Sequence, residues 1–356
     1  MMARRILICL HDFSRGGTER VAIGLASQWV AAGRTVSILC GSSEGGLRDA
    51  VDRHVKIIKL NPPVKRGPLS RLRLGRAMGK RLTTLRPDAI FLPGNYHAPL
   101  ANGLRAGDPQ VVIGLKISNP PLPQGVPFGE KLFRRATRGV SGFAAMNSGL
   151  THQLEALLPG RDIVTLYDPV YVRPGTAKPP QARAHEILWI GRLEPQKDPL
   201  LALKTMAALG GDYFLTMLGE GSLQRKVERS IAALDLTDRV QLVGHVPEIE
   251  PYLAAADALL ITSHYEGGPA VAVEALAQGV PVVGTDCSFL LQDLLRIEEA
   301  GRIVSSREPV ALASALAAVC DRPHSLEALQ ALTAPFEPQT CAQAYLDWFD
   351  RLMADG

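Results

Sequence analysis

Short apolar runs alternate with longer amphipathic stretches along the whole chain. Runs of three to six mainly apolar residues indicate buried strands, and apolar positions three and four apart, as in 19–32 and 70–85, indicate helices. The predicted strands are 6–10, 36–40, 55–60, 89–92, 111–115, 143–146, 187–190, 214–218, 240–243, 258–262, 280–283 and 302–304. Because strands and helices alternate in two successive trains, the chain is predicted to form two α/β domains, each with a doubly wound parallel sheet.

The alternation stops near residue 171, where prolines and glycine interrupt the apolar period. A stretch of this composition is typical of a linker. The length of 356 residues also favours two domains, because single cores stop growing beyond roughly 250–300 residues. The last helical pattern has one apolar stripe, which could fold back onto the first domain. The predicted parts are a first domain over 1–170, a linker over 171–185, a second domain over 186–335 and a C-terminal helix over 336–356.

The charge of the chain is unevenly distributed. The net charge is +4, but residues 1–172 carry 24 Lys and Arg against 11 Asp and Glu, a net charge of +13, and the remainder carries −9. A basic half predicts an anionic partner, such as a membrane surface or a nucleic acid.

Several classes of protein are excluded by composition. The five cysteines are scattered without a C-x-x-C pair, which indicates reduced thiols in the cytoplasm and excludes a disulfide scaffold or a zinc site. No apolar run approaches the length of about 18 residues that a membrane-spanning helix needs. The first apolar run, 6–10, is too short for a secretory leader.

Two clusters of cations lie in the basic half. The stretch between Lys65 and Arg86 holds eight Lys and Arg without an acid, and its stripe of Leu74, Met78 and Leu82 predicts an amphipathic helix. A second cluster lies between Lys131 and Arg138. We expect these clusters to dock on the anionic inner face of the membrane, with the apolar stripe either inserted shallowly or buried against the sheet.

The segment after the run 258–262 combines glycines, a proline and two glutamates, and it is the strongest candidate for a ligand-binding site. Its residues of interest are Glu266, Gly267, Gly268, Pro269, Ala270, Val271 and Glu274. The glycines permit a sharp turn, and Pro269 suits the first position of a helix because it lacks an N–H group. The next two amides would then be free to bind a phosphate, with one glutamate near each end of a diphosphate ligand. An ordinary helix start with two incidental glutamates gives the same pattern.

A second segment follows the run 187–190 and contains Arg192 and Lys197. Two cations on one strand-to-helix loop can converge on the oxygens of a phosphate. A solvated turn capped by Asp198 is the alternative interpretation. Since both segments follow strands of the same domain, together they predict a diphosphate pocket.

These motifs resemble the retaining nucleotide-sugar glycosyltransferases of the GT-B fold, in particular glycosyltransferase family four. The G-R-L-x-x-x-K loop is followed about 70 residues later by E-G-x-P-x-x-x-x-E-A, and the spacing of Glu266 and Glu274 is that of the family's E-x7-E motif. Residues 280–283 match its G-V-P-V-V strand, and Gly16 and Gly17 open a helix as in its G-G-x-E-R. The resemblance covers nearly the whole chain.

The resemblance implies a role for each matched residue. Arg192 and Lys197 would hold the donor diphosphate and stabilise the departing nucleotide in place of a metal, and no D-x-D motif is present. Glu266 would bind the transferred sugar and act with these two cations in catalysis, and Glu274 would bind the ribose. The implied donor-binding residues are Gly16, Gly17, Gly219, Glu220, His245, Val246, Gly267, Gly268, Pro269, Ala270, Val271 and Glu274. No metal or cofactor is expected.

Two departures from the family pattern stand out. Many members have a histidine after a first-domain strand, but here the run 111–115 leads into Lys-Ile-Ser-Asn. His97, after the preceding strand, could take this place, or it could be an ordinary loop residue. The sequence after 280–283 lacks the frequent D-x-x-G-G, so the donor is not specified.

The sequence therefore predicts a metal-independent glycosyltransferase, passing a sugar from a nucleotide diphosphate to a glycan or lipid-linked acceptor in cell-surface polysaccharide or glycolipid synthesis. A nucleotide-sugar epimerase on the same fold is an alternative. A nucleic-acid-binding protein is a third, disfavoured because aromatic residues are only 5% and no nucleic-acid motif is present. A dinucleotide-dependent dehydrogenase is excluded, because G-x-G-x-x-G follows neither first strand.

Overall fold

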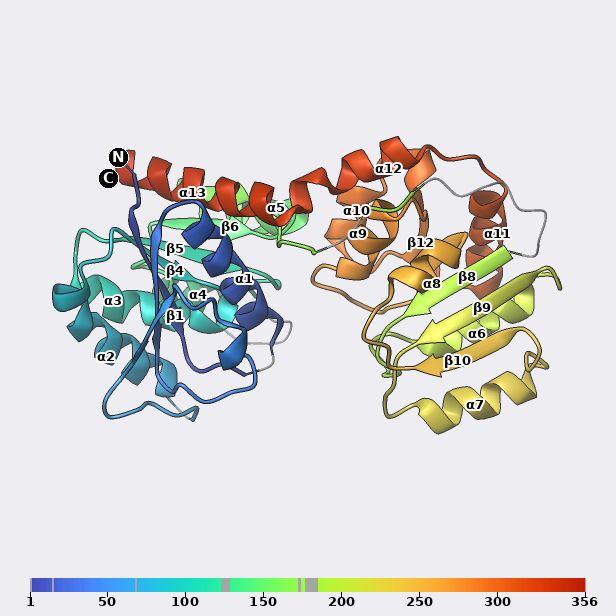
Figure 1. Cartoon of the computed structure of the whole chain (residues 1–356), viewed down its shortest axis with the longest axis horizontal. Helices are drawn as coiled ribbons and strands as arrows, with labels where there is room; N and C mark the ends of the chain where they lie inside the picture. Colours follow the sequence, from blue (N-terminus) through green and yellow to red (C-terminus); the bar gives the residue numbers. More distant parts are fainter. Residues whose placement is uncertain are drawn as a thin grey trace. The chain divides into compact units, whose positions relative to one another are not determined.

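The computed structural model describes residues 2–14, 16–67, 69–122, 129–171, 174–176 and 185–355. The chain divides into two compact units. Unit 1 comprises Met1–Pro169 and Phe336–Gly356, and unit 2 comprises Val170–Pro335 (Figure 1). Most of the stretch 171–185, the predicted linker, lies outside the described residues.

Unit 1 contains a parallel sheet whose described strands follow the order β3-β2-β1-β4-β5-β6-β7. The strands are β1 (Arg5–Leu10), β2 (Thr35–Cys40), β3 (Lys56–Lys59), β4 (Ala89–Leu92), β5 (Val112–Ile117), β6 (Gly142–Ala145) and β7 (Asp162–Thr165). The helices are α1 (Gly17–Ala31), α2 (Ser70–Leu85), α3 (Ala101–Gly107), α4 (Gly129–Ala136), α5 (Ser148–Leu157) and α13 (Pro338–Ala354), with 3-10 turns η1 (Arg48–Ala50) and η2 (Asn95–Leu100). The sequence pattern does not predict β7, because its residues are only half-buried and include a charge.

Unit 2 contains a second parallel sheet, in the order β10-β9-β8-β11-β12-β13. Its strands are β8 (His185–Ile190), β9 (Tyr213–Leu218), β10 (Val240–Gly244), β11 (Ala258–Ile261), β12 (Val282–Thr285) and β13 (Gly301–Val304). Its helices are α6 (Pro199–Ala208), α7 (Gln224–Ala233), α8 (Glu250–Ala255), α9 (Ala270–Ala277), α10 (Phe289–Leu294), α11 (Pro309–Cys320) and α12 (Leu326–Thr333). Two doubly wound parallel sheets confirm the predicted fold class, and the predicted strands agree with the observed ones to within two residues.

Helix α13 completes the core of unit 1, although it comes from the far end of the chain. It lies beside α1 in Figure 1. Its buried Tyr345 and Phe349 pack edge-on against Trp29 and Phe91. Trp29 Nε1 also donates to the backbone oxygen of Ala342, at 3.1 Å. One face of the unit 1 sheet is therefore covered by helices from opposite ends of the sequence.

The apolar stripe of α2 is part of the core. Leu74, Met78 and Leu82 are fully buried, so the expectation of a stripe exposed to lipid is wrong and the buried alternative is correct. The cause is close helix packing: a Cβ at Gly79 would lie 2.2 Å from the backbone oxygen of Gly103 on α3. Two glycine-bearing helix faces approach each other too closely for lipid to intervene. Within the described residues, no helix is both long and apolar enough to cross a bilayer.

Candidate active site

Two loops meet at the carboxyl ends of β8 and β11, which are neighbours in the sheet of unit 2. The strand order reverses between them, since β9 and β10 extend from β8, and β12 and β13 extend from β11. Ligands of open parallel sheets bind beside such a reversal, outside the carboxyl ends of the strands. The predicted residues Arg192 and Lys197 lie on the first loop, and Glu266 lies on the second.

An ion pair joins the two loops. Lys197 Nζ lies 2.5 Å from Glu266 Oε1, and the two side chains are only 20% and 10% exposed. Ser263 Oγ donates a further hydrogen bond of 2.6 Å to the same carboxylate oxygen. Because both partners are largely withdrawn from water, salt screens their attraction less than that of a surface pair. A cation and a carboxylate from separate sequence motifs thus form one contact.

The backbone of the first loop is held from the second. Thr262 Oγ1 lies 2.9 Å from the backbone oxygens of Lys197 and Asp198, toward which it donates. The same hydroxyl accepts a hydrogen bond from Trp189 Nε1 at 3.0 Å. Asp198 caps α6 by accepting from the amide of Leu201. Asp198 therefore caps the helix, as the alternative of a surface turn predicts. The turn is also hydrogen-bonded to Thr262, so it is not a simple solvated turn.

Arg192 is the exposed member of the group. Its Nη2 donates to Gln196 Oε1 at 3.3 Å, and Gln196 Nε2 donates to the backbone oxygen of Tyr265 at 3.0 Å. The backbone amide of His264 donates to the backbone oxygen of Gln196. Gln196 therefore links the two loops a second time, and the Arg192 guanidinium retains free donors for a ligand.

A pocket of about 320 Å³ lies beside Arg192. It is lined by Ile190, Gly191, Arg192, Leu218, Gly219, Glu220, His245, Val246 and Ile249. Five of these residues are predicted site residues, brought together because β8, β9 and β10 end at the same edge of the sheet. Gly219 has a φ of +131°, and a Cβ there would lie 1.9 Å from the Gly191 backbone oxygen, so only glycine fits this wall.

Helix α9 begins one residue later than expected. Pro269, with φ of −72° and ψ of 94°, is the N-cap, and Ala270 is the first helical residue. The extended ψ of Pro269 keeps it outside the helix. As the first residues of α9, Ala270 and Val271 have amides without an intrahelical acceptor. Gly267 and Gly268 precede them in the turn from β11.

Glu274 lies one turn into α9 and is half-buried. Burial raises the pKa of its carboxyl to about 7, and the charge of Glu250 on α8 adds to this increase. A carboxyl desolvated in this way is suited to accept hydrogen bonds from ligand hydroxyls, which would replace the lost water.

The first-domain glycines lie in unit 1 beside a cluster of charges. Gly16 is the N-cap of α1 and Gly17 its first residue. Arg66 pairs with Asp12 at 2.6 Å and with Glu19 at 3.2 Å, and the Glu19 carboxylate lies against Gly16. Although burial raises the pKa of Asp12, the Arg66 guanidinium lowers it to about 2. Arg66 is therefore neutralised locally and is not a free cation of the basic stretch.

His97 is predicted either to take the place of the missing family histidine or to be an ordinary loop residue. It lies in η2 and is 1% exposed, and burial lowers the pKa of its imidazole to about 3, with the Arg66 charge contributing. Within the described part of the chain, neither ring nitrogen has a hydrogen-bond partner. The ring is therefore neutral near pH 7 and almost completely withdrawn from solvent.

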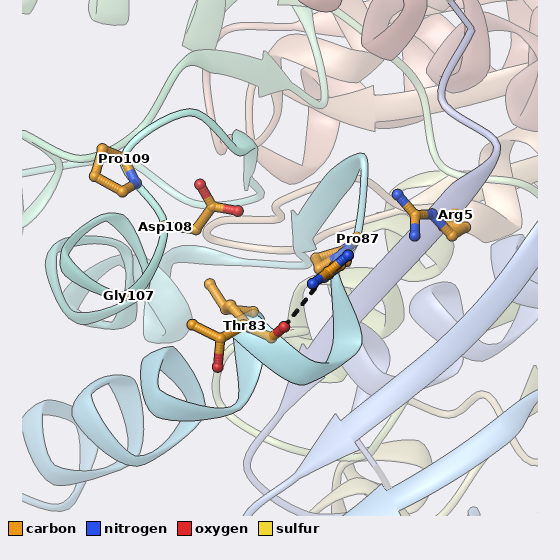
Figure 2. Close-up of a pocket in the computed structure, with 8 residues that line it drawn as sticks. Arg5, Thr83, Pro87, Gly107, Asp108 and Pro109 are labelled. Carbon is orange, nitrogen blue, oxygen red and sulfur yellow. Dashed lines mark hydrogen bonds between the residues drawn. The ribbon is translucent and has the colours of Figure 1, made fainter.

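A second hollow lies in unit 1. It measures about 520 Å³ and is lined by Arg5, Leu82, Thr83, Arg86, Pro87, Gly107, Asp108 and Pro109 (Figure 2). These residues precede or begin β1, β4 and β5, so the hollow lies at the amino ends of the strands, opposite the edge where ligands bind. It contains none of the predicted catalytic or donor-binding residues. Among the described residues, no three His, Cys, Asp or Glu side chains gather as a metal-binding group would.

Three residues of the network carry no motif signal in the sequence. Thr262 and Ser263 directly follow β11 and could be suspected only because polar residues follow an apolar strand. Arg307, in the loop after β13, donates to both residues' backbone oxygens and to Asp198. Its participation depends on the strand order and has no signal in the sequence.

Comparisons with known proteins match both halves of the chain. The family of glycosyl transferases group 1 matches residues 177–332, and the glycosyl transferase 4-like domain matches residues 16–167. A glycogen synthase of Mycobacterium tuberculosis is 32% identical over 181 residues, 48% of this chain and 44% of that protein. A lipopolysaccharide 1,6-galactosyltransferase of Salmonella typhimurium is 28% identical over 160 residues, 43% of this chain and 45% of that protein. The matched segments thus span less than half the length of these curated relatives.

A solved structure resembles the chain over its whole length. The lipopolysaccharide outer core galactosyltransferase WaaB superimposes with a TM-score of 0.82, covers 99% of both chains and is 18% identical. At this identity the likeness concerns the fold alone. With a group 1 domain in the second half, a 4-like domain in the first and the two parallel sheets described above, the chain belongs to the group 1 glycosyltransferases and has the GT-B fold.

Proposed function

We propose that this protein is a retaining, metal-independent glycosyltransferase, which moves a hexosyl group from a nucleoside diphosphate donor to a glycan or lipid-linked acceptor. The relatives named above act on glycogen and lipopolysaccharide, which supports a role in polysaccharide or glycolipid synthesis. The observation that carries the proposal is the contact of Lys197 with Glu266 beside the glycine-walled pocket and Arg192.

Arg192 and Lys197 neutralise the departing diphosphate in this proposal. An ammonium group has three donors, so Lys197 can keep its bond to Glu266 and still donate to a phosphate oxygen. The Arg192 guanidinium adds a planar fork on the open side of the pocket. Charge stabilisation of this kind lowers the barrier most where the charge develops, which is on the leaving group.

The two glutamates hold the rest of the donor. Glu266 is oriented by Lys197 and Ser263 and accepts from hydroxyls of the transferred sugar. Glu274 accepts from the ribose, and the backbone of His245 and Val246 lines the base. The assignment of the two glutamates rests on the family resemblance, and that of His245 and Val246 also on their place in the lining of the pocket.

The acceptor is proposed to lie at the inner face of the membrane. The polar face of α2 exposes cations without described acidic partners, including Arg73, Arg76 and Lys80. Leu69 and Leu72, at its amino end, are 66% and 46% exposed and replace the buried stripe as the apolar contact. Each cation near an anionic surface contributes roughly 1 kcal/mol, so a few suffice for reversible association.

A donor panel tests the activity. The purified chain is incubated with UDP-glucose, UDP-galactose, UDP-N-acetylglucosamine or GDP-mannose, and release of the nucleoside diphosphate is followed with and without EDTA. We expect slow hydrolysis of one donor and an increase in melting temperature with that donor. Turnover abolished by EDTA would refute metal independence, and an inverted anomeric product, seen by NMR, would refute retention.

The same panel separates the alternatives. An epimerase would convert the sugar of the donor without a net transfer to an acceptor, which chromatography of the products detects. A nucleic-acid-binding protein would be stabilised by DNA and not by any nucleotide sugar.

A further inference from the structure

We propose that Arg307 is a positioning residue of this active site, which fixes the two loops that carry Lys197 and Glu266. The inference rests on the proposed function for its kinetic consequences. The arrangement of the guanidinium and its acceptors stands independently of which donor is used.

The Arg307 side chain forms three hydrogen bonds to the two loops. Nη2 donates to Asp198 Oδ2 at 2.6 Å and to the Thr262 backbone oxygen at 2.9 Å. Nη1 donates to the Ser263 backbone oxygen at 2.9 Å. One side chain therefore connects the loop after β8 with the loop after β11.

Two of the three acceptor residues are directly connected to a proposed catalytic residue. Asp198 follows Lys197 in the chain, and the hydroxyl of Ser263 donates to Glu266. Arg307, its acceptors, Lys197 and Glu266 thus form a closed ring of covalent and hydrogen-bonded links. A shift of either loop would change the distance between the ammonium and the carboxylate.

The backbone of the first loop needs such support. Asp198 has a φ of +46°, in the left-handed region that is unfavourable for a residue with a Cβ. Conformations of this kind persist only where surrounding contacts hold them. The bond from Arg307 to the Asp198 carboxylate, together with the Thr262 hydroxyl, supplies those contacts.

The position of Arg307 explains why an arginine is required. It lies after β13, and β12 separates that strand from β11 in the sheet. A long side chain with a planar fork of donors can reach two carbonyls and a carboxylate at once, whereas a lysine offers one compact charge. The side chain is 33% exposed, so its bonds are partly shielded from water.

The first experiment measures the loops without any donor. Amide hydrogen exchange is compared in the wild type, Arg307→Gln and Arg307→Lys, with Arg302→Gln as the matched control on an exposed site of β13. We expect faster exchange at residues 192–198 and 262–266 in both Arg307 variants and no change in the control. Unchanged exchange in these two loops would overturn the proposal.

The second experiment measures kinetics with the donor that the panel selects. We expect Arg307→Gln to lower kcat about 10- to 100-fold, as displaced catalytic groups do, with a KM changed less than about threefold. Asp198→Asn keeps the helix cap and removes the charged acceptor, so it should produce a similar loss. If Arg307 acts through Lys197, Arg307→Gln should cause no further loss in a Lys197→Ala background.

The outcomes are distinguishable. Full additivity of Arg307→Gln and Lys197→Ala, or a loss explained by a lowered fraction of folded protein in circular dichroism, would overturn the positioning role. If the wild type turns over no donor, the proposed function fails, while the exchange experiment still decides whether Arg307 orders the loops.

Discussion

At the scale of single residues, the candidate site is a set of charges whose environments differ. Lys197 and Glu266 are largely buried and paired, Arg192 is exposed, and Glu274 is half-buried and affected by the charge of Glu250. Residues of the same charge should therefore respond differently to substitution, because burial determines whether a lost partner leaves an uncompensated charge.

Lys197→Ala and Arg192→Ala should both reduce transfer but differ in stability. Each is expected to lose about 2–4 kcal/mol of transition-state stabilisation, as for loss of an oxyanion donor. Only Lys197→Ala should also lower the urea midpoint, because it leaves the buried Glu266 carboxylate without its cation. Lys204→Ala, an exposed lysine on α6, is the control and should change neither quantity. Near-normal rates in both site variants would contradict the assignment.

Glu274 should make stability depend on pH. Its carboxyl has an ordinary pKa of 4.5 and a folded-state pKa of about 7, so between these values the folded chain binds more protons than the unfolded chain. The free energy of unfolding should therefore fall as pH rises through this window, by at most about 3 kcal/mol. Glu274→Gln should remove this part of the dependence. Parallel stability curves for the two proteins between pH 4.5 and 7 would refute it.

At the scale of elements, glycines at strand and helix contacts decide how closely the backbone segments approach. Gly219 after β9 touches the Gly191 backbone, and Gly79 of α2 touches α3. The first approach forms the wall of the pocket, and the second directs the apolar stripe of α2 into the core and its cations outward.

Gly219→Ala should be destabilising and should close the pocket. The substituted residue would keep an unfavourable positive φ, at a cost of about 1–3 kcal/mol, and its Cβ would clash with a carbonyl oxygen. Gly210→Ala is the matched control, because a Cβ there meets nothing within 4 Å and the residue is exposed. Urea denaturation should give a lower midpoint for Gly219→Ala than for Gly210→Ala. Equal midpoints would show that the contact between Gly219 and the Gly191 backbone leaves room for a Cβ.

The exposed face of α2 should determine binding to anionic vesicles. Changing Arg73, Arg76 and Lys80 to Glu should abolish co-sedimentation at low salt, and high salt should weaken binding of the wild type. Met78→Ala should cost about 2–5 kcal/mol of stability and leave vesicle binding of the folded protein unchanged. Equal binding of the wild type to neutral and anionic vesicles would exclude an electrostatic mode.

At the scale of the whole molecule, unit 1 is not one continuous segment. Its core includes α13, whose Tyr345 and Phe349 pack against Trp29 and Phe91 from the first part of the chain. The small residue Gly114 on β5 makes room for Trp348 and Phe349. The two ends of the sequence are therefore expected to fold together.

A fragment of residues 1–169 should not fold cooperatively. Without α13, the aromatic side chains that it covers would be exposed to water, at a cost of roughly 1.5–3 kcal/mol for each large side chain. Joining residues 336–356 to this fragment through a Gly-Ser linker should restore a sharp thermal transition. An equally sharp transition in the fragment alone would show that α13 is dispensable for this core.

Much of the fold could be predicted from the sequence, because apolar periodicity depends on local geometry. Short apolar runs identified the strands, apolar positions three and four apart identified the helices, and the alternation of the two predicted parallel sheets. Strand β7 was not predicted, because it is partly exposed, begins with a charged residue and contains no apolar run of three residues. The motifs around Lys197 and Glu266 were recognisable because both follow strands of the same domain and together match a family pattern.

Tertiary structure alone decided which of these residues touch. The Lys197–Glu266 pair depends on β8 and β11 being neighbours, and the contacts of Arg307 depend on β13 lying two places further along. The burial of His97 and of the α2 stripe likewise depends on which elements pack over them. Composition and spacing determine what a segment can form, whereas the distances between side chains from distant segments exist only after the sheet has ordered its strands.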